Sequence, residues 1–271
     1  MSRVFDALKR VGGEAVPSLS ASPGVFLEAL DKGLHIESIP TAKIHLGSES
    51  RLVLHTDPQS PSAERYRLLR IRLEAVRKGA EIKTLLITSP GPREGKSTLT
   101  LNLAAALAEK ENHSVLVLEG DLRCPTLAQS LGLKLSTGLT QCTHDDVGLQ
   151  SAIWKIEPLG FYLLPAGKPT NNPAEILNSA WFAETKERLA SMFDWILIDS
   201  PPAIPIVDTV SLKDHADATL LVVRAGRTQQ SAMDETVRIL GADKILAILL
   251  NGVEKFDRGY YEYYERYAAE K

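Results

Sequence analysis

The chain has 271 residues, of which 44% are hydrophobic and 24% are charged, and its formal net charge is −3. This apolar share supports a folded core, and the near balance of charge argues against a basic nucleic-acid-binding protein. The two cysteines, Cys124 and Cys142, are too few for a disulfide scaffold, and no apolar run approaches the roughly 20 residues that span a bilayer. The N-terminus lacks the apolar core of a secretion signal, so we expect a cytoplasmic protein.

Residues 1–60 are expected to form a weakly structured N-terminal arm, because glycine, serine and proline are scattered through them without a long period. At the very start, Val4, Phe5, Leu8 and Val11 have helical spacing. Two interpretations of this short helix remain open. It could pack on its own domain, or it could dock on a partner, and the few basic residues favour a protein over a lipid surface.

Residues 61–253 alternate between helical and strand-like segments, which indicates an α/β domain. A helix is expected over 62–78, with Ser62 as its N-cap. Further helices are expected over 96–110 and 173–190, and strands over 83–89, 114–120, 161–167, 195–200, 218–223 and 245–252. Several of these strands are continuous apolar runs, which are typical of strands buried on both faces. We therefore predict a mostly parallel sheet with helices on both faces.

The segment ITSPGPREGKST (87–98) joins a predicted strand to a predicted helix and ends as a phosphate loop ends. Gly95 permits close approach of the backbone to phosphates, Lys96 reaches the β- and γ-phosphates, and the Ser97 hydroxyl binds Mg²⁺. The first glycine position of G-x-x-x-x-G-K-[ST] is Pro90, which has no N–H to give, although Gly91 beside it can still make the turn. The predicted nucleotide contacts in this loop are Gly91, Glu94, Gly95, Lys96, Ser97 and Thr98.

Acidic residues follow two more predicted strands. VLVLEGDLRCP (115–125) places Glu119 and Asp121 at a strand end, and WILIDSPP (195–202) places Asp199 at another. Because ligands of open parallel sheets bind beyond the carboxyl ends of the strands, these carboxylates should lie near the phosphate loop. Asp199 is predicted to hold Mg²⁺ directly or through water, and Asp121 is a second metal ligand or base candidate. The alternative for each is a helix cap.

The phosphate loop, the two acidic motifs and a tyrosine-rich C-terminus together resemble the bacterial tyrosine kinases of capsule and exopolysaccharide synthesis. The resemblance implies a P-loop NTPase-like fold, ATP and Mg²⁺ as cofactors, and transfer of the γ-phosphoryl group to tyrosines of a neighbouring subunit. It also implies a base at Glu119, where the family usually has aspartate, and an Asn251 side chain that faces the adenine. Arg123 could hold phosphate or the acceptor, although an ion pair explains it equally well. Lys96 and Asp121 complete the candidate catalytic residues.

The segment 254–271 is a predicted tyrosine-rich tail that supplies the phosphoacceptors Tyr260, Tyr261, Tyr263, Tyr264 and Tyr267. Three of these tyrosines have helical spacing and could instead pack a terminal helix. Charged residues interleave with the tyrosines, which favours a mobile tail that reaches another subunit. Phosphorylation of all five would add about −7.5 to −10 charges. The resulting repulsion could release the tail and loosen a ring of subunits.

Glu64, Arg67 and Arg70 match the E-x-x-R-x-x-R helix of the same family, and their spacing places them on one helix face. Taken alone, they could form an ordinary solvated charged surface. The resemblance implies instead a contact that builds a ring-like homo-oligomer. It also implies a separate transmembrane activator, which would hold the protein at the inner face of the cell membrane.

Two other functions remain open. A nucleotide-dependent assembly switch of the chromosome- or septum-positioning type has a similar fold, but such proteins typically carry a lysine where this chain has Gly91. The third possibility is a non-catalytic ATP-binding regulator of polysaccharide chain length. The fate of the γ-phosphate distinguishes the three, because it reaches tyrosine, is released as free phosphate, or stays on the nucleotide.

Overall fold

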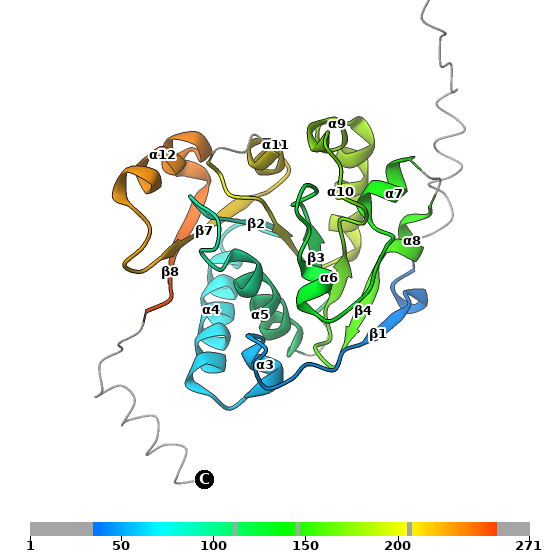
Figure 1. The fold of residues 1–271 in the computed structure, drawn as a ribbon, viewed down its shortest axis with the longest axis horizontal. Coiled ribbons are helices and arrows are strands. Elements are labelled where there is room, and N and C mark those ends of the chain that lie inside the picture. Colours follow the sequence, from blue (N-terminus) through cyan, green and yellow to red (C-terminus); the bar gives the residue numbers. More distant parts are fainter. Residues whose placement is uncertain (1–34, 111–112, 145–146, 205–207, 254–271) are drawn as a thin grey trace, which may run out of the picture. The chain divides into compact units, whose positions relative to one another are not determined.

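A computed structural model describes residues 35–110, 113–144, 147–204 and 208–253, which build one eight-stranded sheet covered by helices (Figure 1). The strand order is β1-β4-β5-β3-β6-β2-β7-β8, and neighbouring strands pair in parallel except β4 and β5. The strands are β1 (Thr41–Lys43), β2 (Thr84–Thr88), β3 (Val115–Glu119), β4 (Trp154–Glu157), β5 (Tyr162–Leu164), β6 (Trp195–Asp199), β7 (Ala218–Arg224) and β8 (Ile245–Asn251). The predicted α/β fold with a mostly parallel sheet is confirmed.

The helices lie on both faces of this sheet, with α4 and α5 on one side and α10, α11 and α12 on the other (Figure 1). The α-helices are α3 (Val53–Thr56), α4 (Pro61–Arg77), α5 (Lys96–Ala108), α6 (Leu127–Ser130), α7 (Leu139–His144), α8 (Leu149–Ala152), α9 (Pro173–Leu177), α10 (Ala180–Met192), α11 (Asp208–Asp214) and α12 (Gln230–Leu240). Two short 3₁₀ helices are η1 (Ile36–Ser38) and η2 (Ala242–Lys244). None of the helices described is long and apolar enough to cross a membrane.

The continuous apolar strands bury both of their faces. In β7, Leu220 and Val222 join the main core beneath α4 and α5, whereas Leu221 and Val223 pack against Leu240 of α12. Successive side chains of a strand point to opposite faces, so an uninterrupted apolar run serves two helix layers at once. This burial holds the carboxyl ends of β2, β3 and β6 side by side.

Two helix predictions need correction. The N-cap of α4 is Ser60 rather than Ser62: its Oγ accepts a hydrogen bond from the Ala63 N–H at 3.2 Å, and Pro61 occupies the first helical position, where a missing N–H costs nothing. The predicted helix over 173–190 is two helices, α9 and α10, because the Ser179 Oγ accepts from the Phe182 N–H at 3.1 Å and starts a new helix there.

Part of the predicted N-terminal arm belongs to the fold. Residues 41–43 form β1, which pairs with β4 at one edge of the sheet, and Ile44, Leu52 and Leu54 are buried in the main core. The carbonyl of Arg51 accepts a hydrogen bond from Asn102 of α5 at 2.9 Å. These elements are too short to show a period in the sequence, so only tertiary contacts define them. The predicted helix near Val4 lies outside the described residues.

Candidate active site

The phosphate loop connects β2 to α5 at the carboxyl edge of the sheet. Gly95 has φ 95°, a left-handed conformation that favours glycine, and a side chain at this position would collide with the Asn251 amide. No side chain caps α5, whose first residue is Lys96, so its N-terminal N–H groups are available to a phosphate. Gly95, Lys96, Ser97 and Thr98 are all partly exposed, as residues that contact a bound nucleotide must be.

Two strand-end side chains clamp this loop from the β7–β8 side. The Asn251 Nδ2 donates to the Glu94 carbonyl at 2.8 Å, and the Arg224 Nη1 donates to the Arg93 carbonyl at 3.2 Å. Arg93 itself has φ 63°, so both clamps hold backbone in an unusual conformation. Asn251 thus lies at the loop, and its predicted contact with adenine stays a prediction. Arg224 was missed, and its position at the end of the LVVR strand was the available signal.

Glu94 turns its carboxyl inward rather than toward solvent, with 5% of the residue exposed. Burial raises its pKa, while the Thr228 hydroxyl, the Gly91 backbone and the nearby charge of Arg227 oppose the rise. Glu94 therefore ties the loop to the segment after β7. Its predicted contact with the nucleotide stays a prediction; its Oε2 is buried without a hydrogen-bond partner among the described residues.

The candidate magnesium site combines Ser97 and Asp199. Asp199 ends β6, where it is 2% exposed; the Thr100 Oγ1 donates to its Oδ1 at 3.1 Å, and Ser97 is near enough to lower its pKa. Burial raises the pKa of Asp199 to about 7, against the opposing effects of Ser97 and Lys96. A hydroxyl and a carboxylate beside a phosphate loop fit Mg²⁺, which takes few protein ligands and completes its shell with phosphates and water.

No group of three or more His, Cys, Asp and Glu side chains in the described part of the chain could hold a metal ion. The Ser97–Asp199 pair agrees instead with an ion that enters together with a nucleotide.

Asp121 follows the end of β3 by two residues and lies near Lys96. Its Oδ1 accepts from the Cys124 N–H at 3.0 Å. Burial raises its pKa, the charge of Lys96 lowers it, and the charge of Asp208 raises it further. The same lysine charge also lowers the pKa of Asp199, so the structure brings Lys96, Asp121 and Asp199 together as the sequence predicted. Whether Asp121 binds metal or takes a proton stays a prediction.

Arg123 forms an ion pair with Asp208, the first residue of α11. Its Nε and Nη2 donate to the two carboxylate oxygens at 2.7 and 3.2 Å, and its Nη1 donates to the Asn171 carbonyl at 3.2 Å. The Asp208 side chain is only 3% exposed, whereas that of Arg123 is 43% exposed. The guanidinium thus faces solvent at the rim of the site while its position is fixed by a buried carboxylate. The predicted contact of Arg123 with phosphate or acceptor remains untested.

Glu119 has a different environment from the one expected of a base. Its Oε1 accepts from the N–H groups of Thr126 and Leu127 at 2.6 and 2.7 Å, and its Oε2 accepts from the Ala166 N–H at 2.9 Å. The residue is 1% exposed. This carboxylate therefore joins the start of α6 to the segment after β5, and both of its oxygens already accept backbone hydrogen bonds. The extra methylene relative to aspartate gives it the reach to these N–H groups.

We expect Glu119→Gln to lower the free energy of unfolding by about 1–3 kcal/mol, because the amide NH₂ would face a backbone N–H that needs an acceptor. Chemical denaturation measures this change, and Glu187→Gln, on an exposed part of α10, is the matched control. Unchanged stability with a lost rate of phosphoryl transfer would contradict this structural role and support Glu119 as the base.

Glu64, Arg67 and Arg70 lie on one face of α4, as predicted, but their charges are engaged within the chain. Arg67 pairs with Glu64 at 2.5 Å, with Glu109 at 2.6 Å, and donates to the Pro58 carbonyl at 2.7 Å. Arg70 donates to the Ala106 carbonyl at 2.7 Å and pairs with Glu109 at 3.2 Å. The bonds from Arg67 lower the pKa of Glu109. This network fixes α4 on α5, and its role between subunits stays a prediction.

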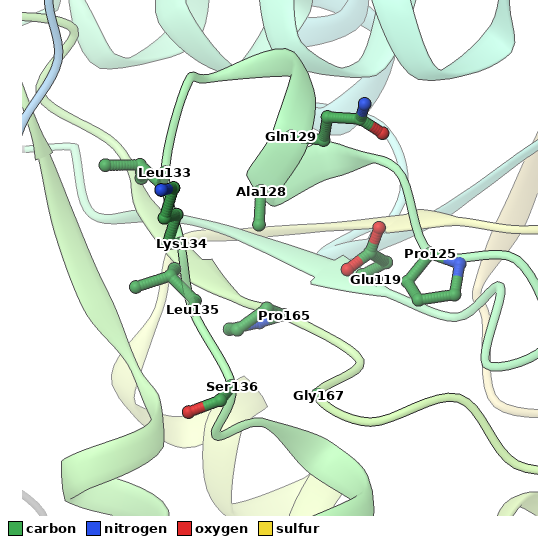
Figure 2. Close-up of a pocket in the computed structure, with 10 residues that line it drawn as sticks. All are labelled: Glu119, Pro125, Ala128, Gln129, Leu133, Lys134, Leu135, Ser136, Pro165 and Gly167. Carbon is green, nitrogen blue, oxygen red and sulfur yellow. The ribbon is translucent and has the colours of Figure 1, made fainter.

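A cavity of about 330 Å³ opens on the far side of Glu119 from the phosphate loop. Figure 2 shows Glu119 and Pro125 on one side of it, the chain from Leu133 to Ser136 on the other, and Ala128 between them. This cavity could not be predicted from the sequence, because its walls come from the short helix α6 and from loops. The predicted acceptors, from Tyr260 to Tyr267, lie outside the described residues.

Comparison with known proteins identifies the relatives of this chain. Residues 86–253 match the family model described as "Cellulose biosynthesis protein BcsQ". The tyrosine-protein kinase YwqD of Bacillus subtilis (strain 168) is 29% identical over 218 residues, which are 80% of this chain and 92% of YwqD. The tyrosine-protein kinase CpsD of Streptococcus agalactiae is 30% identical over 188 residues, which are 68% of this chain and 82% of CpsD.

Solved structures agree with these relatives. The crystal structure of the chimerical protein CapA2B2 superposes with a TM-score of 0.71 at 27% identity, over 80% of this chain and 96% of that one. The septum site-determining protein MinD of Pyrococcus horikoshii OT3, complexed with Mg-ADP, is more distant. It has a TM-score of 0.54 at 25% identity and covers 65% of this chain and 72% of MinD. The P-loop NTPase-like fold is thus confirmed.

Proposed function

The chain belongs to the BcsQ-type P-loop family and, within it, to the bacterial tyrosine-protein kinases of capsule and exopolysaccharide synthesis, and on this premise we propose that it transfers the γ-phosphoryl group of ATP to the tail tyrosines of a second copy. One observation carries the proposal. Lys96, Ser97 and Asp199 meet at the open N-terminus of α5, and Asp121 lies on the adjacent side of the same lysine.

Each residue of this site has a definable task. Lys96 would bind the β- and γ-phosphate oxygens and offset the charge that develops during transfer. Ser97 and Asp199 would hold Mg²⁺, which supplies further charge neutralisation on the phosphates when bound. Phosphoryl transfer has a loose transition state, so fixing the donor and acceptor in line accounts for most of the acceleration.

Asp121 is the group best placed to interact with the tyrosine hydroxyl. Glu119 donates nothing and accepts three backbone bonds, so its oxygens are already engaged. Burial raises the pKa of Asp121, which makes it a better proton acceptor than an exposed aspartate. The rigid Arg123–Asp208 pair stands beside it and would hold an acceptor segment by its exposed guanidinium edge.

The chemical fate of the γ-phosphate tests this proposal. The full chain is incubated with Mg²⁺ and γ-labelled ATP, and the label is assigned to phosphotyrosine, to free phosphate or to unreacted nucleotide. We expect phosphotyrosine in the wild type and none when the five tail tyrosines are replaced by phenylalanine. Free phosphate alone would instead support the positioning-type ATPase, and neither product, even with a membrane activator added, would support a nucleotide-binding regulator.

Association between copies is part of the proposal, because one active site must meet another copy's tail. Leu68 and Ile71 of α4 are 44% and 56% exposed and lie beside Arg67 and Arg70. Exposed aliphatic side chains next to arginines are a composition typical of protein interfaces. We infer that α4 contacts a second copy in a ring-like assembly, and that a separate transmembrane protein recruits this assembly to the membrane.

We expect Ile71→Glu to weaken self-association at least tenfold, because a carboxylate would be buried against the second copy without a partner. Sedimentation velocity over a range of protein concentrations measures this change. Ile248→Glu, at a similarly exposed position of β8, is the matched control. An unchanged assembly in Ile71→Glu would exclude this face of α4 as the contact.

A further inference from the structure

We propose that the cavity beside Glu119 docks one tyrosine side chain from the tail of a second copy while a neighbouring tyrosine of that tail is phosphorylated. The inference rests on the proposed function, which supplies the acceptor tail, and adds a second subsite to it. At about 330 Å³ the cavity lies within the roughly 300–1,000 Å³ range of pockets that bind small ligands, so a single aromatic side chain fits in it.

The walls of the cavity match the chemistry of a tyrosine. Pro125, Leu133, Leu135 and Pro165 supply apolar surface for the faces of a ring. Polar groups occur among them as well: Gln129, Lys134 and Ser136 also line the cavity. Tyrosine needs this combination, because its ring is apolar and its hydroxyl seeks a hydrogen-bond partner. Figure 2 shows the Ala128 side chain directed into the space between the two walls, where its small size leaves room.

The strand order places this cavity on the side of the phosphate loop away from the clamp of Asn251 and Arg224. The phosphate loop follows β2, whose neighbours are β6 on one side and β7 on the other. Asn251 and Arg224 clamp the loop from the β7–β8 side. The cavity lies at the carboxyl ends of β3 and β5, which are separated from β2 by β6. A nucleotide at the loop therefore has the clamp on one side and the cavity on the other.

The distance from the cavity to the metal site suits adjacent residues of one peptide. Glu119, which lines the cavity, is the register partner of Asp199 across β3 and β6. Neighbouring strands are about 4.8 Å apart, and an extended peptide advances about 3.3 Å per residue. A tail with one tyrosine in the cavity thus brings tyrosines one to a few positions away near Lys96. Alternate residues of an extended peptide point to opposite sides, so they can enter different subsites.

The tail has the length, spacing and charge for this role. Tyr260 is the seventh residue after Val253 and Tyr267 the fourteenth, so an extended tail reaches about 23–50 Å beyond β8. Tyr260–Tyr261 and Tyr263–Tyr264 are adjacent pairs, which suit two neighbouring subsites, and Glu262, which separates the two pairs, complements Lys134 at the cavity.

Kinetics with two tail peptides test the inference. Both peptides keep Tyr264 as the acceptor; in one the other four tyrosines are phenylalanine, which fills the cavity but accepts no phosphate, and in the other they are alanine. The enzyme is the full chain with its own tail tyrosines replaced by alanine, so that no tail competes. We expect a KM about tenfold lower for the phenylalanine peptide, with similar kcat values.

Variants of the cavity complete the test. Ala128→Trp fills the space and should reduce the KM difference to less than twofold while the affinity for ATP is unchanged. Ser130→Trp, at an exposed position of the same helix, should retain the full difference. Lys134→Glu reverses the charge of an exposed residue that lines the cavity and should raise the KM of the phenylalanine peptide more than that of the alanine peptide, which keeps the test valid if Ala128→Trp does not fold.

Equal KM values for the two peptides in the unaltered cavity would overturn the inference, and so would a full KM difference in folded Ala128→Trp. Below the concentration at which the copies associate, autophosphorylation of the wild type should become faster per chain as protein concentration rises; an unchanged rate across the range in which sedimentation shows monomers turning into oligomers would show that a chain's own tail is the occupant. Failure of the proposed function has a different signature, because ATP would be hydrolysed and neither peptide would be phosphorylated.

Discussion

Lys96→Ala is expected to lower the rate of tyrosine phosphorylation about 10³-fold, the loss typical when a cation that stabilises a developing charge is removed. Lys96 is the first residue of α5, and its charge lowers the pKa of both Asp121 and Asp199, so it lies between the two candidate carboxylates. Arg123 stands at the rim of the site and is tied to Asp208, so it does not replace a lysine at the start of α5. Single-turnover measurements with saturating Mg²⁺ and ATP separate this loss from weaker binding.

The matched control for this loss is Lys110→Ala. Lys110 follows the other end of the same helix and pairs only with Glu74 among the contacts described, at 3.3 Å. Its removal should leave the rate within about twofold of the wild type, since surface ion pairs contribute little. A Lys96→Ala rate within tenfold of the wild type would show that the phosphate loop is not where transfer occurs.

Asp199→Asn is expected to have two opposite effects. It should lower the phosphorylation rate by about 10²-fold or more, because one of the two protein ligands of Mg²⁺ loses its charge. It should also stabilise the protein free of metal and nucleotide at pH 8, because ionising a carboxyl buried to this degree opposes folding. An active site that stabilises charge in its ligand commonly destabilises the empty protein in this way.

The pH dependence of stability isolates the second effect. Burial raises the pKa of Asp199 from its ordinary 3.8 to about 7, so the folded protein keeps this carboxyl protonated where the unfolded chain ionises it. The stability gained from this difference is fully present below about pH 4 and is lost as the pH rises through 7. Between these values, metal-free wild type should lose stability relative to Asp199→Asn by up to about 1.4 kcal/mol per pH unit.

Denaturant titrations at pH 5, 6, 7 and 8 in the presence of a chelator measure this difference. Asp234→Asn, on the exposed side of α12, should follow the wild-type pH profile and serves as control. Parallel profiles for wild type and Asp199→Asn would contradict a buried, protonated Asp199. When Mg²⁺ and nucleotide are added, the wild-type stability should no longer fall with pH as it does in the chelator, since metal binding favours the ionised form of Asp199.

The central sheet was predictable because several of its strands are continuous apolar runs in the sequence. WILID and ATLLVV are buried on both faces, and runs of this kind leave few alternatives for the chain. β1 and β4 were missed for the opposite reason. β1 has three residues and only one of them is buried, so its burial depends on pairing with β4 and on α5 rather than on local sequence.

The candidate site likewise contains residues that could be placed from the sequence and contacts that depend on the path of the loops. Ser97, Asp121 and Asp199 could be placed near Lys96 from the sequence, because the carboxyl ends of neighbouring parallel strands meet at one edge. The partners of Glu119 could not be foreseen, since Thr126, Leu127 and Ala166 reach it only through the path of two loops. Glu109 shows the same limit: nothing in the sequence pairs it with Arg67, which lies one helix earlier in the chain.

Mixing two variant chains, each lacking one part of the reaction, shows whether one copy phosphorylates the tail of another. One chain carries Lys96→Ala and an intact tail; the other has an unaltered site and phenylalanine at all five tail tyrosines. After incubation with Mg²⁺ and ATP, mass spectrometry of the separated chains maps phosphotyrosine on each. We predict phosphate on the 260–267 tyrosines of the Lys96→Ala chain, transferred by the other copy. An unmodified Lys96→Ala chain, with ATP converted to ADP and free phosphate, would contradict the account.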